Sequence, residues 1–74
     1  MRRPAFTIEQ LRSFVAVAEH EHISRAAASL FLTQAAVTQQ LRNFEHAVGL
    51  QLLERDGRRI RLTDAGRSLA ETLS

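Results

Sequence analysis

The 74-residue chain has no cysteine, lysine, tryptophan or tyrosine. Without cysteine it forms neither a disulfide framework nor a thiolate metal site. No apolar run approaches the ~20 residues that a membrane-spanning helix needs. The first residues, MRRPAF, lack the apolar segment of a signal peptide. We therefore expect a cytoplasmic protein with no membrane partner.

The absence of lysine shapes the charge of the chain. All ten basic residues are arginines, set against eight acids, so the net charge is only +2. The sequence pI of about 11.0 is high because nothing titrates between histidine and arginine. A net charge of +2 gives little long-range steering, so local clusters matter more. Residues 55–61 hold four arginines against one aspartate, and forked arginine side chains suit phosphate and guanine.

The residue patterns of enzymes are also missing. The three glycines each stand at an expected turn or helix end, so no phosphate-cradling loop forms. Zinc needs three or four convergent ligands, and without cysteine His20, His22 and His46 are too few. We interpret these histidines as solvent-exposed, and no Ser–His–Asp arrangement is present. The chain is therefore predicted not to be an enzyme and to hold no metal or cofactor.

The first half of the chain has the pattern of two helices. Residues 7–10 read Thr-Ile-Glu-Gln, a capping box that predicts a helix from Ile8 to His20. Phe6 and Leu11 stand where a hydrophobic staple forms, and the expected apolar stripe is Ile8, Leu11, Phe14, Val15 and Ala18. Ser24 is predicted to cap a short alanine-rich helix over residues 25–31, whose inward-facing residues are Ala26, Ala27 and Leu30.

Residues 33–48, TQAAVTQQLRNFEHAV, are predicted to form one helix, capped by Thr33, with two unlike sides. One side is apolar and carries Val37, Leu41, Phe44 and Val48. The other has the groups that bind base edges and phosphates in a DNA major groove: Gln34, Ala35, Thr38, Gln39, Arg42, Asn43 and His46. An amide-rich solvated face is the alternative, although such faces more often carry Glu–Lys pairs. A short helix followed closely by this one matches a helix-turn-helix, without the usual glycine in the turn.

A hairpin is predicted directly after this helix, which Gly49 ends. Short strands over residues 51–55 and 58–62 flank Asp56-Gly57, a strong two-residue hairpin signal. Ile60 and Leu62 are expected to pack inward, with Arg59 and Arg61 outward and Arg58 at the tip. Arginines on a hairpin that follows a recognition helix are typical of a wing that reaches a minor groove or phosphates. An ordinary solvated hairpin with edge charges is the alternative.

A final helix is predicted from Thr63, which caps it, with Asp64 in its first turn. Ala65, Leu69 and Leu73 share one side of it. The chain stops at Ser74 without a helix cap, which indicates either a shortened chain or a helix that continues further. Leu69 and Leu73 are expected to pair with a two-fold mate. The alternative is a monomer in which they pack back on the first helix, at Phe14 and Leu11.

These residues together resemble a known family. LTQAAVTQQLRNFEHAVGLQLLER followed by RRIRLTDAG, and FVAVAEHEHISRAAASL before it, are similar to the N-terminal DNA-binding domain of LysR-type transcriptional regulators. The resemblance implies a mainly α winged helix-turn-helix with a three-helix core, a hairpin wing and a C-terminal linker helix. It implies a DNA-binding domain over residues 1–62 and the start of a dimerisation helix over residues 63–74, without the effector-binding domain that takes a small molecule.

The resemblance also assigns site residues and partners. It implies a homodimer on a dyad in double-stranded DNA, in the nucleoid, with the recognition helix in the major groove and the wing at the minor groove. The implied and predicted DNA-binding residues are Thr33, Gln34, Ala35, Thr38, Gln39, Arg42, Arg58 and Arg59; the dimer residues are Leu69 and Leu73. The chain departs from the family pattern at Ala35, where proline is usual, and at Gln39, where arginine is usual. A protein-interaction winged helix and a molybdate-regulator type of DNA-binding domain remain alternatives.

Overall fold

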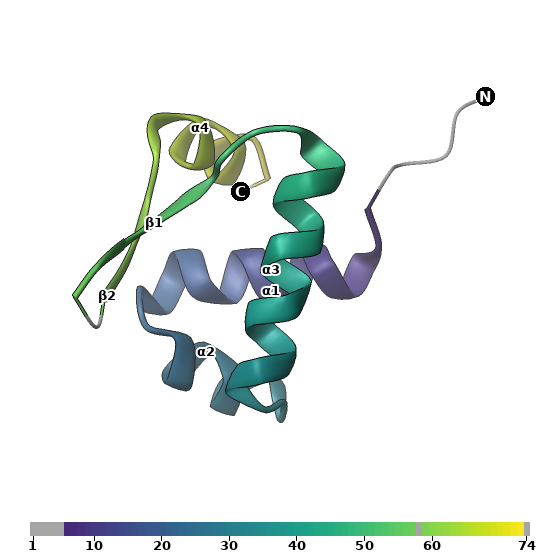
Figure 1. Ribbon diagram of the computed structural model, residues 1–74, viewed down its shortest axis with the longest axis vertical. Helices are drawn as coiled ribbons and strands as arrows, with labels where there is room; N and C mark the ends of the chain where they lie inside the picture. The colour runs from purple at the N-terminus through teal and green to yellow at the C-terminus, as the bar shows by residue number, and fades with distance from the viewer. Residues whose placement is uncertain (1–5, 58, 74) are drawn as a thin grey trace.

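The computed structural model describes residues 6–57 and 59–73, which form four helices and one antiparallel hairpin (Figure 1). The elements in order are α1 Ile8–His20, α2 Ile23–Leu30, α3 Gln34–Val48, β1 Leu53–Asp56, β2 Arg59–Leu62 and α4 Asp64–Leu73. Helices α1, α2 and α3 pack on one another, and β2 contacts both α1 and α4. The predicted winged helix-turn-helix is confirmed.

Helix α1 begins at the predicted capping box. The Thr7 backbone N–H donates to Gln10 Oε1, and the Gln10 N–H donates to Thr7 Oγ1, both at 3.2 Å. The predicted apolar stripe is partly wrong, because Ile8 is 63% exposed and Val15 is 37% exposed. The buried side instead consists of Ser13, Phe14, Ala16 and Val17. Since α1 contacts α2 and α3 together, its buried side is the one that faces both of them.

Helix α2 begins earlier than the sequence predicted. Its N-cap is His22, so Ser24 lies inside the first turn, where its hydroxyl hydrogen-bonds His22 Nδ1 at 2.7 Å. The predicted Ser24 cap is therefore wrong. Glu21 adopts a left-handed φ of 52° and reverses the chain immediately after α1. Phe31, at φ 59°, ends α2 in the conformation that glycine usually supplies, and so the turn before α3 forms without glycine.

Helix α3 buries the predicted side. Thr33 Oγ1 accepts from the Ala36 N–H at 3.1 Å, and Gly49 ends the helix at φ 80°. Val37, Leu41 and Phe44 are buried, and Val48 is half-buried. The Phe44 ring lies edge-on to Phe6 and tilted against Phe14, with centroids 5.1 and 5.2 Å away. Helix α3 thus packs against α1 (Figure 1), and its polar side is directed away from the core.

The hairpin is shifted along the chain from its predicted position. Asp56 pairs with Arg59 at the end of the ladder, so Asp56 belongs to β1 rather than to the predicted two-residue loop Asp56-Gly57. Gly57 takes a left-handed φ of 65° there. Ile60 is buried and Arg59 is exposed, as the alternation predicted. Arg58, predicted at the tip, lies outside the described residues.

Helix α4 covers the base of the hairpin. Thr63 caps it as predicted, since Thr63 Oγ1 accepts from the Gly66 N–H at 3.1 Å. Gly66 is buried, and Leu69 is half-buried against the chain's own core. Leu73, in contrast, is 41% exposed. Leu73 is therefore exposed enough to meet a partner, whereas Leu69 is partly covered by the domain's own core.

Candidate nucleic-acid interface

The polar side of α3 is open to solvent. Gln34, Ala35, Gln39 and Arg42 are exposed, and Thr38 is half-buried. The fold therefore brings the predicted contact residues of this helix onto one face, opposite Val37, Leu41 and Phe44. A major groove admits one α-helix, and this face presents to it amides, a hydroxyl, a methyl group and one guanidinium.

Most hydrogen-bond donors on this face have no partner among the described residues of the protein. Within residues 6–57 and 59–73, Gln34 and Arg42 have no hydrogen-bond or ion-pair partner. Gln39 Nε2 donates to Asn43 Oδ1 at 3.0 Å, one turn further along, which orients the amide and leaves its oxygen free. Thr33 Oγ1 caps the helix as an acceptor, so its hydroxyl proton remains available to a phosphate.

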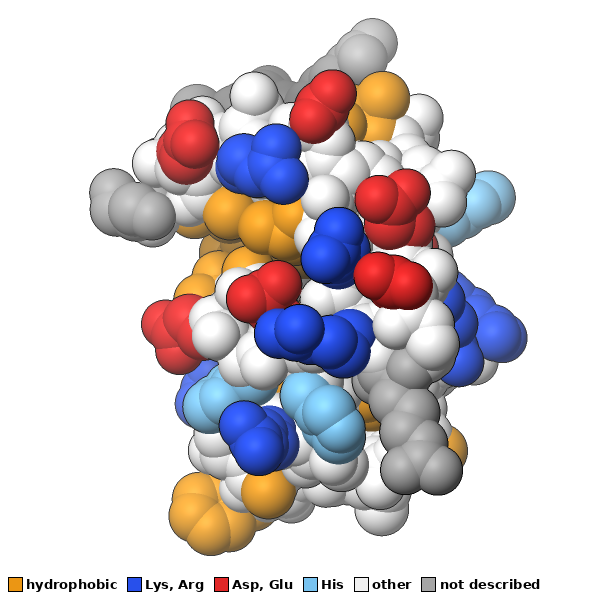
Figure 2. All heavy atoms as spheres, turned by 90° about the vertical axis from the view of Figure 1, so that its left-hand side faces the viewer, with side chains coloured by type: hydrophobic (Ala, Val, Ile, Leu, Met, Phe, Trp, Pro, Cys, Tyr) orange, Lys and Arg blue, Asp and Glu red, His pale blue; other side chains and the backbone are white. Residues whose placement is uncertain are grey.

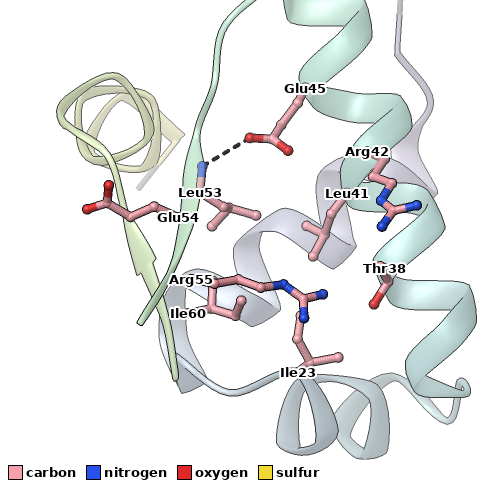
Figure 3. A pocket seen from close by; sticks show the side chains of 9 residues that line it. All are labelled: Ile23, Thr38, Leu41, Arg42, Glu45, Leu53, Glu54, Arg55 and Ile60. Carbon is pink, nitrogen blue, oxygen red and sulfur yellow. Dashed lines mark hydrogen bonds between the residues drawn. The ribbon is translucent and has the colours of Figure 1, made fainter. Parts of the chain in front are cut away.

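The hairpin lies beside this face, and a hollow separates the two. Figure 3 shows the hollow between α3, the start of α2 and the two strands. Its walls carry Thr38 and Arg42 from α3 and Arg55 from β1, and Leu41 and Ile60 are buried behind them. A second hollow adjoins it toward the hairpin loop and is lined by His22, Ser24, Gln34, Thr38, Arg55 and Gly57, among others. The arrangement is a groove with a polar rim.

Arg55 was not predicted as a site residue. It was counted only as part of the basic cluster over residues 55–61. The strand period contained the signal, because Leu53 and Arg55 are two apart and therefore share a face. Figure 3 shows Arg55 directed into the hollow and Glu54 directed away from it. Among the described residues the Arg55 guanidinium has no ion-pair partner.

The side of the molecule that carries the hairpin is not uniformly basic. Figure 2 shows arginine and acidic side chains interleaved over it. Arg61 lies 3.5 Å from Asp56 in an exposed pair, whereas Arg59 is exposed and has no such partner in the described part of the chain. A mixed surface of this kind gives little overall attraction to a polyanion.

Glu45 joins α3 to the hairpin. Its Oε2 atom accepts hydrogen bonds from the Leu52 N–H at 2.7 Å and the Leu53 N–H at 3.1 Å. The second strand is fixed separately, since the Ile60 N–H donates to the Glu21 carbonyl at 3.2 Å. Sequence reasoning did not foresee Glu45 in this role, because the contact joins residues seven and eight apart through a loop. The hairpin thus has a fixed position relative to α3.

The other site classes find no support in the described residues. His20 and His46 are exposed, and His22 is half-buried in contact with Ser24. Over residues 6–57 and 59–73, no group of three histidine, cysteine or acidic side chains is placed to hold a metal ion. Within the same ranges, none of the helices has the length and apolar character to cross a membrane.

Comparison with known proteins gives a consistent result. A family model described as "Bacterial regulatory helix-turn-helix protein, lysR family" matches residues 8–67. The RuBisCO operon transcriptional regulator of Allochromatium vinosum is 48% identical over 63 residues, which are 85% of this chain and 21% of that protein. The SDS degradation transcriptional activation protein of a Pseudomonas strain is 42% identical over 64 residues, which are 86% of this chain and 21% of that protein.

Solved structures agree with the sequence matches. The CbnR DNA-binding domain in complex with DNA superposes with a TM-score of 0.86 at 39% identity, over 90% of this chain and 77% of that one. Oxidised OxyR of Corynebacterium glutamicum gives a TM-score of 0.86 at 39% identity, over 96% of this chain and 22% of that one. The chain spans about a fifth of the length of the curated relatives that it matches.

Proposed function

The chain belongs to the lysR family of bacterial regulatory helix-turn-helix proteins, and from that premise we propose that it reads a specific site in double-stranded DNA. The observation that carries this proposal is the exposed face of α3, whose amides and hydroxyls remain largely free beside a fixed hairpin. The relatives are transcriptional regulators, and one structural neighbour is a DNA complex. The chain is thus the DNA-binding domain of a regulator and not an enzyme.

We assign the contacts by chemistry. In the major groove, Gln34 and Gln39 bind base edges, with a preference for adenine, and the Ala35 methyl touches a thymine methyl. Thr33, Thr38 and Arg42 bind mainly phosphates. The wing residues Arg58 and Arg59 bind at the flanking minor groove, where a narrow groove attracts arginine; Arg58 is assigned from the sequence alone. A small-molecule effector would act through a further domain, and the whole protein would work in the cytoplasm on the nucleoid.

The first prediction concerns base reading. Gln34→Ala should lower affinity for the preferred site by about 1–3 kcal/mol and affinity for random DNA much less. The reason is that an amide bound to a base edge contributes only where the base is correct. The preferred site is first selected from a random duplex pool, and both affinities are then measured by fluorescence anisotropy.

Glu19→Ala is the matched control for Gln34→Ala. Glu19 is exposed on α1, and alanine favours the helix, so neither affinity should change. Equal losses on both DNAs for Gln34→Ala would reassign Gln34 to the DNA backbone. An absence of salt-dependent DNA binding by the wild type would favour the protein-interaction alternative instead.

The second prediction concerns assembly. We propose that α4 pairs with its two-fold mate, which would set the half-site spacing near a whole number of helical turns. Leu73 is exposed, whereas Leu69 is partly buried against the core of the same chain. Burying a leucine at the interface stabilises a dimer by about 1.5–3 kcal/mol. Association costs several kcal/mol, because each chain loses rigid-body freedom. Self-association of this chain should therefore be weak in solution and be detected mainly on a palindromic duplex.

Analytical ultracentrifugation over a concentration series tests this assembly, with and without the palindromic DNA. Wild type should bind the two half-sites cooperatively, and Leu73→Glu should bind them independently. Glu71→Ala, an exposed neighbour on the same helix, is the control and should behave as wild type. If wild type and Leu73→Glu both stay monomeric and bind the half-sites independently, α4 is not the dimer contact.

A further inference from the structure

The placement of α3 and the hairpin constrains the path of DNA between them. One sugar-phosphate strand always separates a major groove from the adjoining minor groove. If α3 lies in the major groove and the hairpin lies at the flanking minor groove, that strand must cross the space between the two elements. This step rests on the proposed function. The space in question is the groove lined by α3, the start of α2 and the strands (Figure 3).

Arg55 is the charged side chain that β1 directs into this groove. Leu53, two residues before Arg55, is half-buried and contacts the core. Ile60, the cross-strand partner of Arg55, is buried. These packed neighbours fix the strand face on which Arg55 lies. The guanidinium therefore extends over an apolar floor toward Thr38 on the opposite wall (Figure 3).

Each acidic side chain around Arg55 accepts other hydrogen bonds, lies in another ion pair or points away from the groove. Glu45 accepts from the two backbone N–H groups at the start of β1. Asp56 lies 3.5 Å from Arg61. Glu54, the third acid near the groove, is directed away from it in Figure 3. Glu45 and Glu54 also line the groove, but no acid among the described residues forms an ion pair with Arg55. The groove places Arg55 near the Thr38 hydroxyl.

We propose that Arg55 is a phosphate-binding residue that holds the DNA strand running between the recognition helix and the wing, with the Thr38 hydroxyl as the donor on the opposite wall. An arginine fork bonds two phosphate oxygens at once, which fixes position as well as supplying charge. The contact carries no base information. Its role is to set the register in which α3 and the hairpin meet their two grooves.

The test combines protein and DNA substitutions. Arg55→Gln should weaken binding to the preferred and the random duplex by a similar factor, about tenfold, and lower the salt slope by about one unit. Arg55→Lys keeps the charge and should retain most of the slope. Arg67→Gln removes an arginine of α4 that lies 3.4 Å from Asp64, and should leave the slope unchanged.

Single methylphosphonates placed along the strand between the two grooves locate the contact. One position should weaken the wild type about tenfold and leave Arg55→Gln unchanged, because the contact is already lost. An unchanged slope in Arg55→Gln, or neutralised phosphates that weaken wild type and Arg55→Gln equally at every position, would overturn the proposal while leaving the DNA-binding function intact. Failure of the wild type to bind either duplex in a salt-dependent way would overturn the proposed function itself.

Discussion

Gly66→Ala is expected to destabilise the domain by more than about 3 kcal/mol, or to prevent it from folding. A Cβ atom at position 66 would lie 2.0 Å from the Leu52 carbonyl oxygen and 3.0 Å from the carbonyl carbon. Both neighbours are backbone atoms, and neither swings aside as a flexible side chain would. Overpacking typically costs about 1–3 kcal/mol where side chains give way, so a backbone clash should cost more.

The clash at position 66 should also disturb the base of the hairpin. The Leu52 carbonyl accepts a hydrogen bond from the Thr63 N–H at 3.0 Å, and the Leu52 side chain is fully buried. Moving this segment to make room for a methyl group would loosen the contact between α4 and Leu52, the residue that precedes β1. A chain of 74 residues has a total stability of roughly 4–11 kcal/mol, so the loss is a large fraction of it.

Gly57→Ala is the matched control, because nothing lies within 4 Å of a Cβ at position 57. Its left-handed φ of 65° should cost about 1–2 kcal/mol and no more. Urea unfolding followed by circular dichroism measures both variants. A Gly66→Ala protein that unfolds within 1 kcal/mol of wild type would show that α4 shifts away from Leu52 at little cost.

The sequence predicted best where structure depends on neighbours along the chain. The capping box at Thr7, the cap at Thr33 and the stop at Gly49 are local features, and they placed the ends of α1 and α3 correctly. The buried side of α3 also followed from one helical period. The predicted cap at Thr63 likewise placed the start of α4 correctly.

The predictions failed where contacts between different helices and strands determine the structure. Helix α1 has more apolar residues than one side can hold, and only its contacts with two other helices show that Val17 is buried while Ile8 is exposed. Ser24 had the right chemistry for a cap, but the left-handed residue Glu21 starts α2 earlier. A shift of one residue in the hairpin loop likewise follows from strand pairing, which the Asp56-Gly57 signal alone does not determine.

The candidate site divides in the same way. The contact face of α3 was predicted as a set, because a helix places it on one side. Arg55 and Glu45 were not assigned, because their roles depend on how the hairpin returns toward α3. The fold adds one fact to the list of proposed DNA-binding side chains, which is the fixed position of the hairpin relative to α3.

Glu45→Ala is expected to weaken both folding and DNA binding, because Glu45 holds the hairpin in its position relative to α3. Its carboxylate accepts from the Leu52 and Leu53 N–H groups, in a part-buried position. Each buried N–H left without a partner costs about 1–3 kcal/mol, so the loss of both partners in Glu45→Ala should lower the stability by roughly 2–6 kcal/mol. Glu45→Gln keeps an acceptor oxygen without the charge and should lose less, about 1 kcal/mol.

The effect on DNA binding separates a positioning role from plain loss of fold. With Glu45→Ala studied at low temperature, where circular dichroism shows the domain folded, the hairpin should no longer be held against α3. Affinity should then fall on preferred and random DNA alike, and minor-groove protection in a footprint should fade while major-groove protection remains. Glu54→Ala, an exposed acid on the outward face of β1, is the control and should change neither stability nor footprint. A folded Glu45→Ala domain with the wild-type footprint would mean that the Ile60–Glu21 hydrogen bond and the packing of Ile60 alone hold the hairpin in place.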